Sequence, residues 1–262
     1  MSTMGIGLTM FAAMLVLMAV RVPIAIAMFV PGALGYMALA GWLPLLSHLK
    51  GAVYGRVSVY DLSVIPLFMF MGALAVQGGL SRALFNFANA LLGRFKGGMA
   101  MAGVLACAAF GSISGSTVAT TATIAQVAYP EMRRIHYSGR LATAALATGG
   151  TMGVLLPPSV TLMVYAILTE QNITKMFLAA YVPAILAAIG YLLAIMVVVR
   201  LHPDTAPQAQ AVPHHELVAG VRAVWPIVLI FTVVFGGIYG GLFTATEGAS
   251  IGTVLTFVIT LL

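Results

Sequence analysis

The sequence predicts an all-α polytopic membrane protein, and three observations carry that prediction. Of the 262 residues, 61% are hydrophobic and only 7% are charged, whereas a soluble domain covers its water-facing surface with about 25% charged residues. The apolar residues also gather into runs of roughly the 20 residues that a helix needs to cross a bilayer. Two runs are much longer and contain helix-breaking residues near their middles, which predicts a re-entrant helical hairpin and a broken helix among the transmembrane helices.

Charge and cysteine content exclude several classes of protein. The net charge is +6, but the basic residues stand singly between apolar runs, so we expect no nucleic-acid partner. We interpret the excess of basic residues as an indication of which loops are cytoplasmic. The single cysteine, Cys107, excludes a disulfide or a cysteine metal cluster within one chain. The run 4–20 has neither a charged start nor a small-residue cleavage motif, so we interpret it as a retained span rather than a signal peptide.

The first part of the chain predicts three spans and one loop. Residues 4–20, 22–43 and 64–80 form apolar runs of about the length that crosses a bilayer. Between the last two runs, residues 44–63 are less apolar, and we expect a loop at the membrane interface there. The residues that predict this loop are Pro44, Lys50, Arg56 and Asp61.

Residues 81–95 predict an amphipathic helix. One helical face holds the apolar residues Leu84, Phe87, Leu91 and Phe95, and the opposite face holds Arg82, Asn86, Asn89 and Gly93. This spacing is typical of a helix that lies in the plane of the membrane interface. The alternative is an amphipathic helix in a water-exposed loop.

Two segments, 97–128 and 141–169, are too long for ordinary spans. A helix of 32 residues would extend about 48 Å, well beyond the ~30 Å hydrocarbon core. The first segment is interrupted at 111–117 by the sequence GSISGST. The second is interrupted by GGTMG at 149–153 and then by LLPPS at 155–159. We therefore expect a helical hairpin in the first segment and a broken helix in the second.

The distribution of positive charge favours a hairpin that enters and leaves on the same side. With an external N-terminus and such a hairpin, nine basic residues are cytoplasmic and three are external. If 97–128 crossed once instead, the later loops would reverse and the count would be five inside against seven outside, contrary to the positive-inside rule. The nine are Arg21, Arg82, Arg94, Lys96, Arg133, Arg134, Arg140, Arg200 and Arg222, and the three are Lys50, Arg56 and Lys175.

The last part of the chain predicts further spans separated by a linker. Apolar runs at 175–199, 223–241 and 244–262 are expected to cross the membrane. Residues 201–216 are rich in proline and in charged or histidine residues, and we interpret them as a cytoplasmic linker. Their three histidines do not predict a metal site, because no cysteine supports them and the segment looks flexible.

The two interruptions suggest a binding site, although a packing role explains either one alone. Irregular backbone at membrane depth is tolerated only inside protein or beside a water-filled cavity. Secondary transporters use such breaks, because freed carbonyls coordinate Na⁺ and half-helix N-termini attract anions. Close helix packing by small residues, or a simple proline kink, is the competing interpretation. The hydroxyl groups that would suit a hard cation belong to Ser112, Ser114, Ser116 and Thr117.

An intramembrane enzyme is not expected. The run 111–115 approaches a serine-hydrolase elbow, but Ile113 stands at the position of the nucleophile. No histidine lies deep in a span beside Ser114 or Ser116, because His136 falls in a predicted cytoplasmic loop. The sequence therefore offers no acid–base partner for a nucleophile.

The order of these motifs resembles the large membrane subunit of tripartite ATP-independent periplasmic (TRAP) transporters, of the dicarboxylate-permease type. The resemblance extends along essentially the whole chain, and its specific parts are the hairpin and the Pro-Pro motif. The matching motifs are GSISGSTVAT at 111–120, YPEM at 129–132, GTMG at 150–153, LPPS at 156–159, PLFM at 66–69, GGL at 78–80 and TATEGA at 244–249.

The resemblance implies a Na⁺-coupled importer of organic acids, such as C4-dicarboxylates or sugar acids, in the bacterial inner membrane. It implies a periplasmic binding protein that delivers the substrate and a small four-helix membrane subunit. The periplasmic N-terminus is predicted instead by the distribution of positive charge. The resemblance also implies two inverted repeats that move as an elevator. Residues 1–200 would form the first repeat, 201–216 the linker and 217–262 the start of the second. Because family members are longer, we expect the chain to be C-terminally truncated.

The family's cation site can be carried over residue by residue. The resemblance implies Na⁺ ligands at the hairpin tip and on the broken helix, with Leu156 and Pro158 contributing main-chain carbonyls. Two other readings stay open: an organic-anion carrier that is coupled to Na⁺ or H⁺ and needs no binding protein, and a non-transporting scaffold. The expected Na⁺ ligands are Ser112, Ser114, Gly115, Ser116, Gly150, Gly153, Leu156 and Pro158, and the substrate candidates are Thr117, Thr151 and Ser159.

Overall fold

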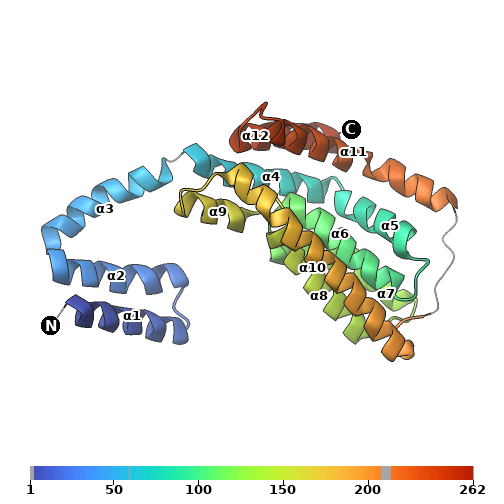
Figure 1. Cartoon of the computed structure of the whole chain (residues 1–262), viewed down its shortest axis with the longest axis horizontal. Coiled ribbons are helices and arrows are strands. Elements are labelled where there is room, and N and C mark those ends of the chain that lie inside the picture. The colour runs from blue at the N-terminus through green and yellow to red at the C-terminus, as the bar shows by residue number, and fades with distance from the viewer. Residues whose placement is uncertain (1–2, 59, 208–213, 262) are drawn as a thin grey trace. The chain divides into compact units, whose positions relative to one another are not determined.

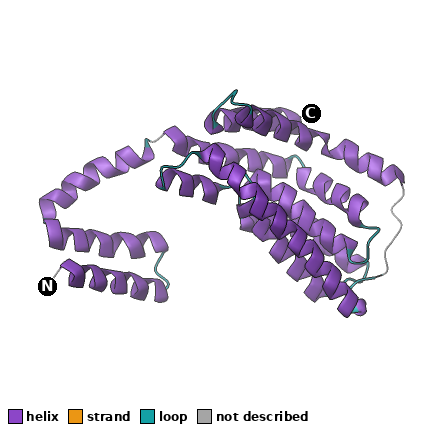
Figure 2. Ribbon diagram, viewed as in Figure 1, coloured by secondary structure: helices purple, strands orange, loops and turns teal. Residues whose placement is uncertain are grey.

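The computed structural model of the chain is helical throughout the part that it describes, residues 3–58, 60–207 and 214–261. Figure 2 shows helices joined by short loops, and no strand occurs in those ranges. The contacts divide the chain into two units, Met1–Val59 and Tyr60–Leu262. The all-α prediction is confirmed for the described residues.

The first unit contains three helices, α1 (Thr3–Ala19), α2 (Ile24–Ala40) and α3 (Trp42–Val57). Helices α1 and α2 pack on each other as neighbours, and α1 has no buried residue. Because both helices are apolar on all sides, they are suited to a lipid environment rather than to water.

The predicted loop at 44–63 is wrong, because α3 covers most of this segment and the short 3₁₀ helix η1 (Tyr60–Ser63) follows it. Pro44 does not break α3, since it lies in the first turn, where a main-chain N–H has no helical acceptor. Gly41, with φ +93°, separates α2 from α3. The loop prediction gave too much weight to single charged residues, which a helix tolerates.

The second unit is built around α6, whose residues are nearly all buried. It contacts α4, α5, α7, α8 and α10, and α11 and α12 pack on α5 and α4 (Figure 1). The helices of this unit are α4 (Val64–Gln77), α5 (Leu80–Leu92), α6 (Gly98–Ser114), α7 (Thr117–Arg134), α8 (Gly139–Leu155), α9 (Val160–Leu168), α10 (Ile173–Leu201), α11 (His214–Tyr239) and α12 (Ala245–Leu261), with a 3₁₀ helix η2 (Pro203–Thr205).

Helix α5 owes much of its amphipathic pattern to protein contacts. Its buried residues include Leu80, Leu84, Phe85 and Ala88, and the helix packs on α6 and α11. Leu91 is exposed, so only part of the predicted apolar stripe faces the bundle. The position of α5 in a membrane interface stays a prediction.

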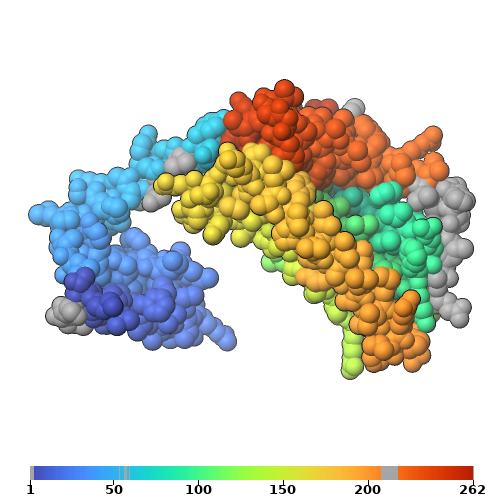
Figure 3. All heavy atoms as spheres, viewed as in Figure 1, coloured from blue at the N-terminus to red at the C-terminus, as the bar shows by residue number. Residues whose placement is uncertain are grey.

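Helix length and composition agree with several membrane crossings. Figure 3 shows that no other helix covers the face of α10 in view. Many of the exposed side chains of α10 are large and apolar, among them Leu186 and Leu193. Four described segments are long and apolar enough to span a bilayer: Tyr60–Gln77, Gly139–Leu168, Ile173–Leu201 and Val218–Tyr239. Four shorter helices, Thr3–Ala19, Ile24–Ala40, Gly98–Ser114 and Ala245–Leu261, are also apolar.

The α7–α8 loop is anchored by hydrogen bonds to main-chain groups of η2 and α6. Ser138 N–H donates to the Thr205 carbonyl of η2 at 2.9 Å, and the Tyr137 hydroxyl accepts from Met99 N–H at 3.3 Å. Burial raises the pKa of the Tyr137 phenol, whose ordinary value of about 10 already keeps it neutral at physiological pH. Of the predicted linker, residues 208–213 lie outside the described part of the chain.

Candidate functional site

The first predicted interruption is a tight turn between α6 and α7. Helix α6 ends at Ser114, and Gly115 adopts a left-handed conformation with φ +62°, which glycine reaches without a Cβ clash. The Gly115 N–H donates to the Gly111 carbonyl at 2.8 Å. Ser116 is extended and begins α7, accepting a hydrogen bond from Ala119 N–H at 3.4 Å. The hairpin predicted from sequence is therefore present as two helices with a short turn, while its entry and exit on one membrane side stay a prediction.

Ser114 and Thr120 connect the two arms of the hairpin. Their hydroxyl oxygens lie 2.6 Å apart, and the two residues are 9% and 0% exposed. The Ser116 N–H also reaches the Ser114 hydroxyl at 3.4 Å. The turn therefore concentrates hydroxyl and main-chain oxygens in a buried position without any charged side chain.

The second predicted interruption separates α8 from α9. Helix α8 ends at Leu155, and α9 begins after Ser159, whose hydroxyl accepts from Leu162 N–H at 3.4 Å. The two residues before Ser159 are prolines, joined by a cis peptide bond. Since proline has no N–H, the carbonyls of Gly153 and Val154 lose their usual donors four residues ahead. The break predicted at 155–159 is present, and the two prolines free carbonyl groups there from their helical donors. The interruption predicted at 149–153 is wrong, because α8 continues through Gly149, Gly150 and Gly153, and a helix tolerates glycine at a cost of about 1 kcal/mol per residue.

The two breaks lie against each other. A Cβ atom built on Gly115 would stand 3.1 Å from the Pro158 carbonyl oxygen, and one built on Gly153 would stand 3.0 Å from the Ser116 carbonyl oxygen. A Cβ on Gly111 would meet the Gly153 Cα at 2.5 Å. Ordinary carbon contacts are 3.5–4.0 Å, so a Cβ at either position would push α6 and α8 apart. Glycine at 111 and 153 therefore lets the two helices approach closely enough for the two breaks to be in contact.

An open cleft of about 510 Å³ borders the hairpin turn. Residues 114–119 form one wall, and Gly72 and Val76 of α4 form another, with Val160 at the start of α9. The N-termini of α7 and α9 both reach this cleft, and such ends carry partial positive charge. No charged side chain is among the described residues that line it. The cleft therefore offers dipoles and oxygens rather than full charges.

The structure brings most predicted residues together, but not all of them. Ser114, Gly115, Ser116 and Thr117 line the cleft. Three further predicted residues lie at the junction, the region where the hairpin turn meets the break between α8 and α9. They are Gly150, Gly153 and Pro158, and Gly150 faces Thr121. Ser159 is fully buried as the cap of α9.

The hydroxyls of Ser112 and Thr151 lie away from the cleft. Ser112 donates to the Ala109 carbonyl at 2.7 Å and, with Leu156, lines a separate apolar cavity of about 500 Å³. Thr151 donates to the Thr148 carbonyl at 2.7 Å and lies 3.1 Å from the Tyr191 hydroxyl of α10. The structure therefore does not join these two hydroxyls to the cleft.

Sequence reasoning missed three residues at the junction, namely Gly72, Thr120 and Thr121. A Cβ on Gly72 would meet the Ser114 Cα at 3.0 Å, so α4 closes on the hairpin turn there. Thr120 and Thr121 belong to a run at 117–123 with four threonines, and this unusual density of hydroxyl groups in an apolar segment was the available signal.

Comparison with known proteins identifies the family. The model of the tripartite ATP-independent periplasmic transporter, DctM component, matches residues 11–262. The chain belongs to this family. The TRAP permease relationship also agrees with the breaks, since GSISGST and LPPS were the motifs that indicated it. The family consists of transporter permeases rather than enzymes, and together with the apolar helices it indicates a multi-pass inner-membrane protein.

Several relatives are proteins with assigned substrates. The chain is 36% identical to the C4-dicarboxylate TRAP transporter large permease protein DctM of Pseudomonas aeruginosa, over 74% of this chain and 45% of that protein. It is 32% identical to the isethionate TRAP transporter permease protein DctMQ of Oleidesulfovibrio alaskensis, over 88% and 36%. It is 26% identical to the sialic acid TRAP transporter permease protein SiaT of Haemophilus influenzae, over 94% and 39%. The aligned part of the chain thus covers less than half the length of each of these three relatives.

Proposed function

We propose that this TRAP permease chain forms part of a Na⁺-coupled secondary transporter that imports organic acids. The observation that supports this most directly is the contact between the hairpin turn and the break of the second helix. Two interruptions in apolar helices would be separate packing features in a scaffold, but here they meet at glycines 111, 115 and 153. Relatives named for C4-dicarboxylates and for sialic acid support the class of substrate.

The chemistry of the junction fits a hard monovalent cation. Hard cations take oxygen ligands, and the junction offers the hydroxyls of Ser114 and Ser116 together with the main-chain carbonyls freed before Pro157 and Pro158. The C-terminal ends of α6 and α8 contribute partial negative charge. We propose that Na⁺ is held by Ser114, Gly115 and Ser116 on one side and by the broken helix on the other.

The same junction would receive the carboxylate of the substrate. Helices α7 and α9 begin beside the cleft, and paired N-termini are a common way to bind anions without a charged side chain. Thr117 lines the cleft at the start of α7 and is placed to donate a hydrogen bond. Coupling then requires that Na⁺ and substrate bind the outward- and inward-facing states with different affinities.

We further propose the architecture and partners that the family implies. The α6–α7 hairpin would be re-entrant, and two inverted repeats would move as an elevator. The N-terminus would be periplasmic, as the distribution of positive charge predicts. A periplasmic binding protein would deliver the substrate, and a small four-helix membrane subunit would lie beside the chain. The fused name of the DctMQ relative supports a second membrane component.

Uptake into proteoliposomes that contain the assembled transporter tests the proposal. Ser114→Ala combined with Ser116→Ala removes two hydroxyls at the junction and should sharply reduce Na⁺-dependent uptake. The matched control is Ser250→Ala, because the Ser250 hydroxyl donates to the Thr246 carbonyl within α12 at 3.0 Å, away from the cleft. Unchanged Na⁺ dependence in the double variant would refute the site assignment.

A further inference from the structure

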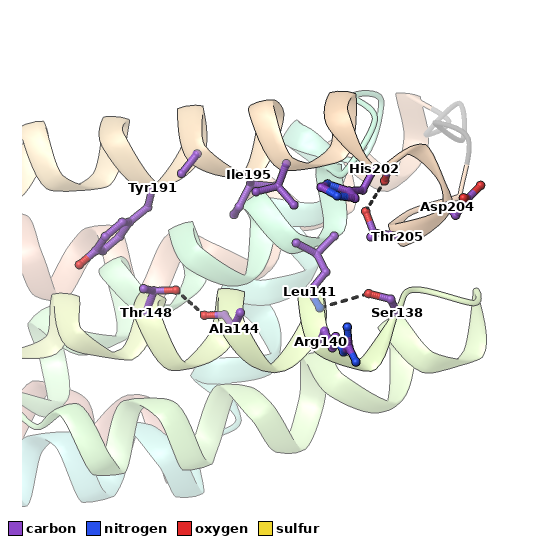
Figure 4. Close-up of a pocket in the computed structure, with 12 residues that line it drawn as sticks. Ser138, Arg140, Leu141, Ala144, Thr148, Tyr191, Ile195, His202, Asp204 and Thr205 are labelled. Atoms are coloured by element: carbon purple, nitrogen blue, oxygen red, sulfur yellow. Dashed lines mark hydrogen bonds between the residues drawn. The ribbon is translucent and has the colours of Figure 1, made fainter.

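A third cavity, of about 660 Å³, lies between α8 and α10 at the end of the bundle near η2 (Figure 4). It shares no lining residue with the cleft at the helix breaks, so the proposed transport site does not explain it. Its wall is apolar and its rim is polar. The wall consists of Leu141, Ala144, Ala194, Ile195 and Val198, with Thr148 and Tyr191 at the inner end, and the rim consists of Ser138, Arg140, His202, Asp204 and Thr205.

The length of the cavity matches one half of a bilayer. On α10 its lining runs from Tyr191 to His202, and that separation corresponds to about 16 Å of helix. A hydrocarbon core of ~30 Å gives each leaflet about 15 Å. Figure 4 shows Tyr191 pointing into the space between the helices at the end opposite His202 and Thr205. The cavity is therefore a groove. Its polar end, at His202 and Thr205, would face water, and its inner end, at Tyr191, would lie near the middle of the membrane.

The polar end carries an available positive charge. The Arg140 side chain is exposed, and the one ion pair among the described residues joins Arg134 to Glu131 instead. Asp204 is also on the rim, but in Figure 4 its carboxylate points away from Arg140 and from the groove. Arg140 also lies in the first turn of α8, whose N-terminus adds partial positive charge. The rim is thus complementary to an anionic group.

We propose that this groove binds a glycerophospholipid with an anionic headgroup. Its phosphate lies at Arg140 and the start of α8, and one acyl chain lies along Leu141, Ala144 and Ile195. A soluble anion would leave the apolar wall in contact with water, whereas a lipid buries the wall and neutralises the arginine. Basic pockets between helices at a membrane surface commonly hold such headgroups. Because the groove borders α8, the lipid supports the helix that carries the second break.

Lipid binding to the delipidated protein in detergent tests this proposal. Native mass spectrometry with phosphatidylglycerol measures the affinity, and phosphatidylcholine serves as the zwitterionic comparison. Arg140→Gln should weaken phosphatidylglycerol binding about fivefold, the factor expected from one basic residue near anionic lipid. The control Arg134→Gln removes a charge from the same end of the bundle, outside the groove, and should change the affinity less than twofold.

A second variant tests the apolar wall independently of charge. Ala144 is exposed in the groove, so Ala144→Phe fills the space without disturbing the core and should abolish bound phosphatidylglycerol. Equal weakening by both arginine variants would indicate diffuse surface charge and overturn the proposal. Normal binding to Ala144→Phe, or displacement of the lipid by millimolar inorganic phosphate alone, would overturn it as well.

Discussion

The close approach of α6 to α8 depends on glycine at position 111, and Gly111→Ala is the sharpest way to disturb it. The new Cβ would lie 2.5 Å from the Gly153 Cα and 2.9 Å from the Gly153 nitrogen. Both atoms are main chain, so no flexible side chain can move aside. To restore an ordinary carbon contact of 3.5–4.0 Å, the two helices must separate by about 1.0–1.5 Å.

That separation has a cost for stability and for the junction of the breaks. Overpacking of a well-packed contact typically costs about 1–3 kcal/mol, and we expect Gly111→Ala to lower the free energy of unfolding by that amount. The same shift moves the hairpin turn away from Gly153 and Pro158. Na⁺-dependent uptake should therefore fall more than the loss of folded protein accounts for.

Unfolding in a denaturing detergent measures the first effect, and uptake per folded molecule measures the second. The matched control is Gly190→Ala in α10, because a Cβ at Gly190 meets nothing within 4 Å. This control should leave stability unchanged or raise it by up to about 1 kcal/mol through helix propensity. If Gly111→Ala were as stable and as active as Gly190→Ala, the close packing of α6 on α8 would be refuted.

Three smaller substitutions test individual hydrogen bonds through the same unfolding assay. Thr120→Val removes the 2.6 Å partner of the buried Ser114 hydroxyl and should cost about 1 kcal/mol; an unchanged stability would contradict the contact. Asn172→Ala removes the side chain that caps α10, with an expected loss of about 1 kcal/mol. Tyr137→Phe deprives Met99 N–H of its acceptor and should cost roughly 0.5–1.5 kcal/mol; equal stability with Phe would show that this bond contributes nothing.

The sequence predicts the helix breaks well because they have local causes. Gly115 reaches a left-handed conformation that other residues avoid, and Pro157 and Pro158 cannot donate main-chain hydrogen bonds, whatever surrounds them. The breaks at Gly115 and at the two prolines therefore follow from residue type. Helix content and the apolar character of the chain follow from composition in the same way. Residue type misleads at 149–153, where α8 continues through three glycines, because packing against α6 and α7 holds the helix together there.

The sequence does not predict which elements meet, because tertiary contacts decide that. Ser114 and Thr120 pair across the hairpin turn, and no helical spacing indicates this contact. Ser112 carries the same hydroxyl as Ser114 but faces a different cavity, since it lies two residues earlier on a helix. The segment at 44–63 was wrongly predicted as a loop. Its isolated charged residues suggested a loop, but single charges do not prevent the backbone from forming a helix.

A Na⁺-dependent shift in the stability of the purified protein tests the central claim most directly, because it requires neither substrate nor partner proteins. The account predicts that Na⁺, but not K⁺ at equal ionic strength, stabilises the protein in a saturable way. At ten times the Kd the gain should be about 1.4 kcal/mol, and Ser114→Ala with Ser116→Ala should remove it. Equal effects of Na⁺ and K⁺, or a full Na⁺ effect in the double variant, would contradict a Na⁺ site at the junction of the two breaks.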